Sequence, residues 1–352
     1  MSEPSPPLPV DSLDMWGATA GLPEQIDEAI DRALRIDLED VGRTPFDTIV
    51  VCGMGGSGIA GDVVAALAWP RSRLPVHVVK DYGLPRYVGE STLVFAVSCS
   101  GDTEETLAAA EDARARGASV VAVSGKGALA GLATQAGWPI VPVPDDVPQP
   151  RAAFGALSVP PLVVLERLGL LDGMERLLRD AAETLSDSRD GLVRPGSTAQ
   201  ELATRIGRTT PLVHGAPGPT GVAAMRWKTQ VNENAKSPAF YSLQPELCHN
   251  EVAGWGQHGD VTRQTLTAVV LRFRGEHPRV ARRIELAEQL MTEVVANVLD
   301  VRTDAVSDVA ALYDLTMLGD FVSLHLAAAE GVDPGPVPVL GELKRHLAEW
   351  SG

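Results

Sequence analysis

Short apolar runs alternate with helix-like segments from Asp47 onward, and this alternation limits the fold more than any other feature. The runs are "DTIVVCG", "VHVVK", "TLVFAVS" and "SVVAVS", and helices are expected at 57–67 and 104–116. Strand runs separated by helical segments are typical of parallel sheets that helices cover on both faces. The sequence therefore predicts an α/β fold with mostly parallel sheets.

The same order of elements returns after a proline-rich stretch at 138–154. Because prolines are excluded from central strands and helix interiors, we place a boundary or a crossover near 145–155, and divide the domains between residues 150 and 151. Further expected elements are helices at 157–185, 199–205 and 304–329, strands at 265–273 and 295–302, and a strand–loop–helix unit that begins at "TTPLVHGAPGP". We predict a lead-in and helix over 1–40, one α/β domain over 41–150 and a second over 151–352.

The net charge of the chain excludes some classes of binding partner. The chain carries 46 acidic against 30 basic residues, a formal net charge of -16. This charge repels phosphate backbones and anionic membrane surfaces, so binding to nucleic acid or to a membrane is not expected.

Three further features bear on where the protein is located. The 3 cysteines are not spaced as metal ligands are, and the N-terminus lacks a basic segment before an apolar one. No apolar run is close to the length that a membrane span needs. These features predict a soluble, cytoplasmic protein.

The segment "VVCGMGGSGIAGDVVAA", residues 50–66, contains a G-x-G-x-x-G pattern between a strand and a helix. Such a turn presents backbone N–H groups and the positive end of a helix dipole, which suit any anion. A dinucleotide site would also need an acidic residue after the second strand, and Asp81 is a candidate. A tight turn with glycines for packing alone is the alternative that this motif leaves open.

A second loop in the same setting, "SCSGDTEETL" at 98–107, favours a smaller ligand. It gathers Ser98, Ser100 and Thr103, one of which could simply cap the following helix. Together with Ser57 on the first loop, however, they are more hydroxyls than capping needs. They also lie at the strand edge where α/β sheets bind ligands. The two loops therefore predict a site for a phosphate monoester.

Four motifs carry a resemblance to a known family: "GMGGSGIAGD", "SCSGDTEET", "NENAKSPAF" and "PELCHNEVAGW". The first two resemble the sugar isomerase (SIS) domain, and with the others the chain resembles the bifunctional phosphoglucose/phosphomannose isomerases over residues 50–344. The resemblance implies two doubly wound, flavodoxin-like SIS halves. It also implies an aldose–ketose isomerase that interconverts glucose 6-phosphate, and mannose 6-phosphate, with fructose 6-phosphate through an enediol, without a cofactor or a metal. The residues expected to hold the substrate phosphate are Gly56, Ser57, Ser98, Ser100 and Thr103.

An enediol mechanism needs a base that carries a proton between two adjacent carbons and a donor for the developing oxyanion. The resemblance makes Glu233 the base. This residue is expected near the carboxyl end of a helix that Ser237 and Pro238 terminate, where the dipole disfavours a carboxylate and so favours proton uptake. Arg151, at the start of a helix, is implied to help hold the enediolate. Without the resemblance, both would be interpreted as surface residues.

The resemblance also assigns His249, in the motif "PELCHNEVAGW", to ring opening and Lys344 to the active site. In relatives this histidine comes from the partner subunit, so a homodimer with shared active sites is expected. A lone loop histidine is otherwise more often structural or solvated.

Two positions depart from the family pattern. Asp102 stands where many relatives have asparagine, which adds negative charge near the phosphate, so its side chain is expected to point away. The segment 331–343 contains no hydroxyl residue, whereas some relatives have a threonine there that is associated with the C2 epimer.

The main alternative function is a regulatory protein that binds a phosphosugar without turning it over. The presence of both Glu233 and His249 argues against it. A nucleotide-dependent oxidoreductase would leave the hydroxyl-rich loop unexplained. A zinc-dependent isomerase would need clustered ligands, and the 7 histidines are scattered.

Overall fold

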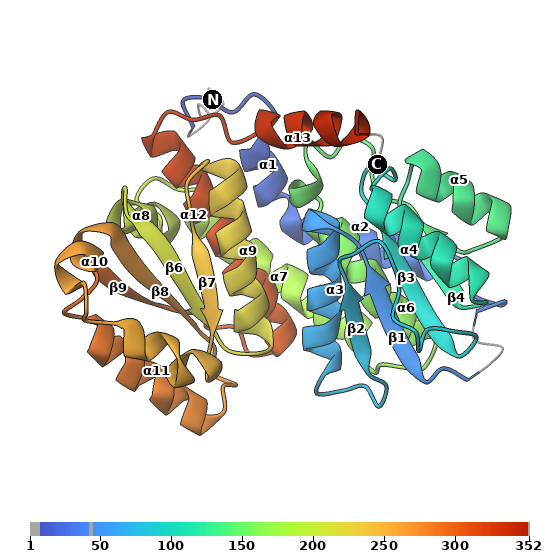
Figure 1. The fold of residues 1–352 in the computed structure, drawn as a ribbon, viewed down its shortest axis with the longest axis horizontal. Helices are drawn as coiled ribbons and strands as arrows, with labels where there is room; N and C mark the ends of the chain where they lie inside the picture. The colour runs from blue at the N-terminus through green and yellow to red at the C-terminus, as the bar shows by residue number, and fades with distance from the viewer. Residues whose placement is uncertain (1–7, 42–44, 351–352) are drawn as a thin grey trace.

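Two parallel sheets covered by helices make up the computed structural model, which describes residues 8–41 and 45–350 (Figure 1). Sheet A has the strand order β2-β1-β3-β4-β5, and all its neighbouring strands pair in parallel. Its strands are β1 (Thr48–Cys52), β2 (Val76–Val79), β3 (Thr92–Val97), β4 (Ser119–Val123) and β5 (Ile140–Val141). This is the strand order of a flavodoxin-like sheet.

Sheet B repeats the arrangement with the order β7-β6-β8-β9, again entirely parallel. Its strands are β6 (Thr210–Gly215), β7 (Phe240–Leu243), β8 (Leu266–Arg272) and β9 (Asn297–Arg302). In each sheet the winding direction reverses beside the first strand, between β1 and β3 and between β6 and β8. The prediction of two doubly wound α/β halves is confirmed.

Alternate residues of β1 belong to different hydrophobic cores. Ile49 and Val51 pack in a cluster with residues of α3 (Gly55–Ala68) and α6 (Phe154–Arg167). Val50 and Cys52 pack with residues of α4 (Glu104–Ala115) and α5 (Gly127–Ala136). Because both faces of the sheet are buried, its strands are continuous apolar runs in the sequence.

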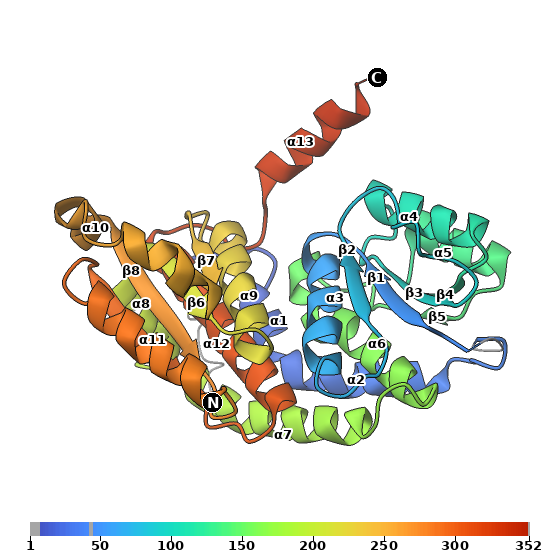
Figure 2. The same ribbon diagram turned by 60° about the horizontal axis from the view of Figure 1, so that its bottom comes forward.

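The larger of these cores continues into the second half of the chain. It includes residues of α2 (Leu22–Arg35), α7 (Met174–Leu192), α9 (Pro219–Asn234) and α12 (Asp308–Ala329), among other helices. Figure 2 shows α2 and α7 side by side beneath the two sheets. By length and composition alone α12 could cross a membrane, but 83% of its most apolar window is buried within the fold. The helix is therefore the centre of a core that the two halves share.

The remaining elements are short or peripheral. They are α1 (Met15–Ala20), α8 (Thr198–Ile206), α10 (Gly259–Thr265), α11 (Pro278–Met291) and α13 (Pro338–Ala348), with three 3₁₀ turns, η1 (Pro150–Ala152), η2 (Glu246–His249) and η3 (Glu251–Gly254).

Some elements differ from the sequence-based expectation. The helix expected at 157–185 is two helices, α6 and α7, separated by a turn. The strand β5 forms inside the proline-rich stretch, at the edge of sheet A, where a missing N–H costs no ladder hydrogen bond. The edge strand β7 and the helix α5 were also not expected. The boundary between residues 150 and 151 stays a prediction, and α6, just after it, packs against α3.

Candidate active site

The glycine-rich loop lies at the carboxyl end of β1 and forms the first turn of α3. The first N–H groups of a helix have no partner within the helix, so this turn offers donors to an anion. A Cβ atom on Gly56 would lie 3.0 Å from the carbonyl carbon and oxygen of Pro150 and 3.1 Å from the nitrogen of Arg151. Only a glycine lets the loop and η1 come this close, and the contact brings Arg151 to the loop.

The hydroxyl-rich loop lies beside it, after β3. The backbone N–H of Cys99 donates to Ser57 Oγ over 3.1 Å, which joins the two loops. Ser98 Oγ accepts from the N–H of Gly101 at 3.0 Å and lies 3.2 Å from Thr103 Oγ1. The expectation that these hydroxyls gather at one edge of sheet A is confirmed. Oxygens that accept backbone N–H groups keep their own protons free to donate elsewhere.

Asp102 points away from this cluster of hydroxyls. Its Oδ1 accepts from the N–H of Ala128 at 2.9 Å, in the first turn of α5. The neighbouring Gly101 has φ 75, and a Cβ there would lie 1.8 Å from the carbonyl oxygen of Lys126, so the loop is pressed against the start of α5. The carboxylate caps α5 where the helix dipole favours negative charge. This explains how an acid is tolerated in a loop that is expected to bind phosphate.

Replacing Asp102 with alanine is therefore expected to destabilise the protein by about 1 kcal/mol, because α5 loses a capping acceptor. Asparagine, which keeps the acceptor oxygen, should recover most of this loss. Urea unfolding of both variants measures it. Equal destabilisation by alanine and asparagine would show that the carboxylate charge matters rather than the hydrogen bond to Ala128.

Arg151 is buried at η1 and uses its guanidinium for several contacts at once. Its Nε donates to Asn234 Oδ1 at 2.7 Å. Its Nη2 donates to the carbonyls of Pro334 and Gly335 at 2.6 and 2.7 Å. Its Nη1 makes the longest contacts of the three nitrogens, 3.3 Å to Glu233 Oε2 and 3.4 Å to Gln149 Oε1. Burial lowers the pKa of Arg151, and the Glu233 carboxylate partly offsets that shift. Nη1 is thus the end of the guanidinium that can turn toward a ligand most easily.

Glu233 lies in the last turn of α9, as the sequence predicts, and its side chain is 29% exposed. The helix ends at Asn234, and Lys236 follows with φ 55, a left-handed conformation common after helices. Lys236 Nζ donates to the backbone carbonyl of Glu233 at 2.5 Å rather than to its carboxylate. Burial and the charge of Arg151 lower the pKa of Lys236. The carboxylate therefore has Arg151 as its cationic neighbour and keeps a face open to solvent.

A buried polar network supports these two residues from behind. Arg226 and Asp320 form an ion pair of 2.6 Å, with side-chain exposures of 2% and 6%. Arg226 Nη2 also donates to the backbone carbonyl of Arg151 at 2.8 Å. Asn234 donates to Ser323 Oγ at 2.9 Å, and Ser323 donates to the carbonyl of Asp320 at 2.6 Å. This network was not predicted from the sequence, although the sequence contains a basic residue in α9 and acidic residues within the apolar run of α12.

His249 lies elsewhere. It ends η2, after β7, and is exposed. The N–H of Gln244, at the start of this loop, donates to the carbonyl of Gly215 at 2.8 Å, at the carboxyl end of β6. Glu233 is at the opposite, amino edge of sheet B, because α9 returns along the sheet. The two residues are thus separated by the length of α9, roughly 20 Å.

Lys344 is also apart from the other predicted site residues. It is exposed on α13, which projects from the body of the molecule (Figure 2). Among the described residues, no hydrogen bond or ion pair joins Lys344 to Arg151 or Glu233. The segment before α13 is nevertheless held at the site, since Arg151 binds the carbonyls of Pro334 and Gly335.

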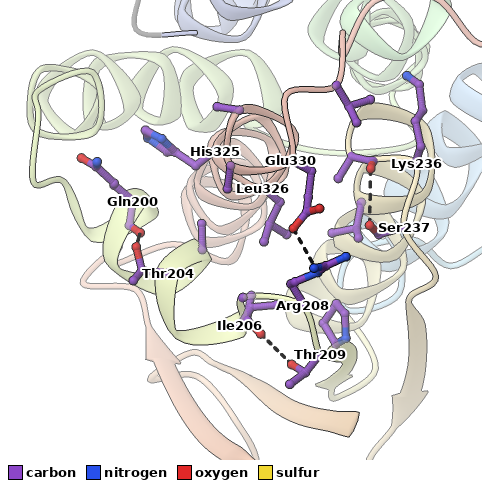
Figure 3. A pocket seen from close by; sticks show the side chains of 18 of the residues that line it. Gln200, Thr204, Ile206, Arg208, Thr209, Lys236, Ser237, His325, Leu326 and Glu330 are labelled. Atoms are coloured by element: carbon purple, nitrogen blue, oxygen red, sulfur yellow. Dashed lines mark hydrogen bonds and ion pairs between the residues drawn. The ribbon is translucent and has the colours of Figure 1, made fainter. Parts of the chain in front are cut away.

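A cavity of 930 Å³ lies beside the carboxyl end of α9 (Figure 3). Its wall includes Gln200, Arg208, Lys236, His325 and Glu330, and Arg208 pairs with Glu330 at 3.5 Å. None of the predicted catalytic or phosphate-binding residues lines it. Across residues 8–41 and 45–350, no group of three or more His, Cys, Asp or Glu side chains could hold a metal ion.

Comparisons with known proteins agree with the two α/β halves of the fold. Residues 45–135 match the model of the SIS domain, and residues 196–347 match the bacterial phospho-glucose isomerase C-terminal SIS domain. Tagatose-6-phosphate ketose/aldose isomerase from Escherichia coli superposes with a TM-score of 0.70 at 16% identity, covering 92% of this chain and 95% of that one. At that identity the likeness concerns the fold alone.

Two curated relatives, both called bifunctional phosphoglucose/phosphomannose isomerase, are closer in sequence. The one from Caldicellulosiruptor bescii is 35% identical over 95% of this chain and 99% of its own length. The one from Aquifex aeolicus is 35% identical over 89% of this chain and 95% of its own. The resemblance inferred from four short motifs thus extends over nearly the whole sequence. The chain belongs to the bifunctional phosphoglucose/phosphomannose isomerase family.

Proposed function

We propose that the protein interconverts glucose 6-phosphate and mannose 6-phosphate with fructose 6-phosphate through an enediol. The observation that carries the proposal is the contact of Arg151 with both Gly56 and Glu233. The contact supports the proposal because the backbone of Arg151 lies against Gly56 while its guanidinium reaches Glu233, so a carboxylate and a cation lie beside the edge of sheet A that is proposed to bind the phosphate. Both aldoses lead to the same enediol, but they carry the C2 hydrogen on opposite faces. One base acting at C1 and C2 serves either epimer when rotation about the C2–C3 bond presents either face of C2 to it.

The phosphate is proposed to bind at the edge formed by Gly56, Ser57, Ser98, Ser100 and Thr103. Ser57, Ser98 and Ser100 each accept a backbone N–H through Oγ, at 3.1, 3.0 and 3.3 Å. Their hydroxyl protons can therefore be directed to one ligand, together with the first amides of α3. Neutral donors of this kind bind a phosphate within a chain whose net charge is -16.

Replacing Ser57 and Ser100 together with alanine is expected to raise KM for the sugar 6-phosphate by about tenfold or more, since two neutral hydrogen bonds of about 1 kcal/mol each are lost. kcat should change less, because the phosphate remains remote from the proton transfer. Initial rates over a range of substrate concentrations separate the two constants. A fall in kcat at constant KM would contradict the assignment of these hydroxyls to phosphate binding.

Proton transfer is assigned to Glu233. Its half-buried carboxylate takes the proton from C2 of the aldose and delivers it to C1, which gives the ketose, while Arg151 Nη1 turns from the carboxylate toward the enediolate oxygen. The other two guanidinium nitrogens of Arg151 stay bound to Asn234, Pro334 and Gly335, which fixes the cation in place. Arg151 is thus proposed to stabilise the negative charge of the enediolate, and only its Nη1 changes partner during the reaction.

Ring opening is assigned to His249 of a second copy of the chain. Since His249 and Glu233 of one chain lie at opposite edges of sheet B, they cannot act on one sugar in the same chain. A symmetric dimer in which each copy lends its exposed His249 to the other removes this difficulty. The protein is therefore proposed to be a cytoplasmic homodimer with two shared active sites. Lys344 is proposed to enter a site when α13 closes over it.

A coupled assay with purified protein tests the proposal. Glucose 6-phosphate and mannose 6-phosphate are supplied in separate reactions, with a metal chelator present. Turnover of both is expected. Turnover of neither, by protein that is folded and binds sugar phosphate, would overturn the proposed activity and favour a regulatory role.

A further inference from the structure

The loop that carries His249 is attached to sheet B at both ends. At its start, the backbone N–H of Gln244 donates to the carbonyl of Gly215. At its end, Glu251 Oε1 lies 3.0 Å from His214 Nε2, in β6. His249 is exposed between these two attachments. Only the second attachment is made by side chains, so only it can be removed by substitution without touching the backbone.

His214 has the properties of an anchor for this loop. Its side chain is 1% exposed, whereas that of Glu251 is 24% exposed. Its Nδ1 is buried and has no hydrogen-bond partner among the described residues. Among the described residues, the hydrogen bond between Nε2 and Glu251 is therefore the only one that the imidazole makes. A buried imidazole whose one hydrogen bond is to a loop carboxylate fixes that loop strongly, because breaking the bond leaves the imidazole without any hydrogen-bond partner in a buried site.

The surroundings of Glu251 strengthen the attachment. Burial alone would raise the pKa of this carboxyl, but hydrogen bonds from His214 and Ser242 lower it. His214 and Ser242 are paired across β6 and β7, so Glu251 sits over the junction of the two strands. The N–H of Glu251 donates to Asn250 Oδ1 at 2.6 Å, and Asn250 Nδ2 donates to Glu246 Oε1 at 3.0 Å. Asn250 thus links the anchored residue Glu251, which follows His249, to Glu246, which precedes it.

We infer that His214 and Glu251 are positioning residues, which hold the loop at 244–251 so that His249 reaches the active site of the other subunit. The inference rests on the proposed function, because it gives the loop its role in a shared site. Neither residue touches the substrate. Loss of the anchor lets His249 move by an ångström or more, and a displacement of this size costs about 10²-fold in rate.

Single substitutions give the first test. His214→Phe and Glu251→Ala are each expected to lower kcat by about tenfold to 10²-fold. KM should change little, since the phosphate-binding hydroxyls lie on sheet A. The double variant should be no slower than the slower single variant, because both remove the same contact. Glu251→Gln, which still offers an oxygen to Nε2, should keep most of the activity. Full activity in Glu251→Ala would overturn the inference.

Mixed dimers give the decisive test, because they separate positioning from folding. Glu233→Gln and His249→Ala subunits are each inactive alone, and equal mixing should restore about one quarter of the wild-type activity, through one intact site in each hybrid. Glu251→Ala is then added to one subunit at a time. On the Glu233→Gln subunit, which supplies the working His249, it should remove most of the restored activity. On the His249→Ala subunit, which supplies the working Glu233, it should have no effect.

Each outcome has a distinct meaning. Loss of the restored activity in the first placement alone supports the inference. Equal loss in both placements would show that Glu251 only supports the fold and would overturn it. Absence of restored activity in the original mixture, without Glu251→Ala, would overturn the shared site and the inference with it, while the isomerase activity itself is measured independently by the coupled assay.

Discussion

Replacing Glu233 with glutamine is expected to lower kcat by about 10²- to 10⁴-fold, the usual contribution of a positioned general base. Glutamine has the same shape and can still accept a hydrogen bond from Arg151, but it cannot take up a proton. Because the phosphate is proposed to bind to other residues, KM should stay within about twofold of the wild-type value. Steady-state kinetics on glucose 6-phosphate and mannose 6-phosphate measure both constants.

Glu330→Gln is the matched control for this variant. Glu330 is a carboxylate at the end of α12 that pairs with the exposed Arg208 and lines the neighbouring cavity. Its replacement should leave kcat unchanged. If the Glu233 variant kept more than about one tenth of the wild-type kcat, Glu233 could not be the base for the reaction.

Asp320→Leu is expected to produce the largest loss of stability, about 3–5 kcal/mol in the free energy of unfolding. The ion pair with Arg226 is almost fully buried, so removal of one partner leaves an unpaired guanidinium in the core. Arg226 also binds the carbonyl of Arg151, so activity should fall together with stability. Urea unfolding monitored by tryptophan fluorescence measures the change.

Two comparisons separate burial from charge in this experiment. The double variant Arg226→Met, Asp320→Leu removes both charges and should recover a large part of the stability. Asp180→Asn breaks the exposed pair with Arg176 and should cost less than about 1 kcal/mol. A loss below about 1 kcal/mol in Asp320→Leu would mean that the buried pair contributes no more than a surface pair.

Most of sheet A could be predicted from the sequence, because its strands are buried on both faces and separated by helices. The strands β1, β3 and β4 lie within a residue or two of their expected positions. The edge strands β5 and β7 could not be predicted. Strand β5 contains only two residues, and β7 begins with the exposed Phe240. An edge strand is determined by its neighbour as much as by its own side chains.

The cluster of hydroxyls at the carboxyl edge of sheet A could be predicted for a similar reason. Loops that follow adjacent parallel strands must meet, so the hydroxyls at 57 and 98–103 had to gather. The partners of Arg151 could not be predicted, because they come from Asn234 and from backbone carbonyls at 334 and 335, far along the chain. The sequence implied the separation of His249 from Glu233 only through the family resemblance, in which the histidine comes from the partner subunit. In the structure the separation follows from the direction of α9, which runs from one edge of sheet B to the other.

The most direct test of the account is hydrogen exchange with solvent at C2 of the sugar. Fructose 6-phosphate is incubated with the protein in deuterated water, and the glucose 6-phosphate and mannose 6-phosphate formed are analysed by NMR. Transfer through an enediol by Glu233 predicts deuterium at C2 that accumulates over repeated turnovers and is absent with Glu233→Gln. Repeated turnover that leaves C2 free of deuterium would contradict an enediol and with it the role proposed for Glu233.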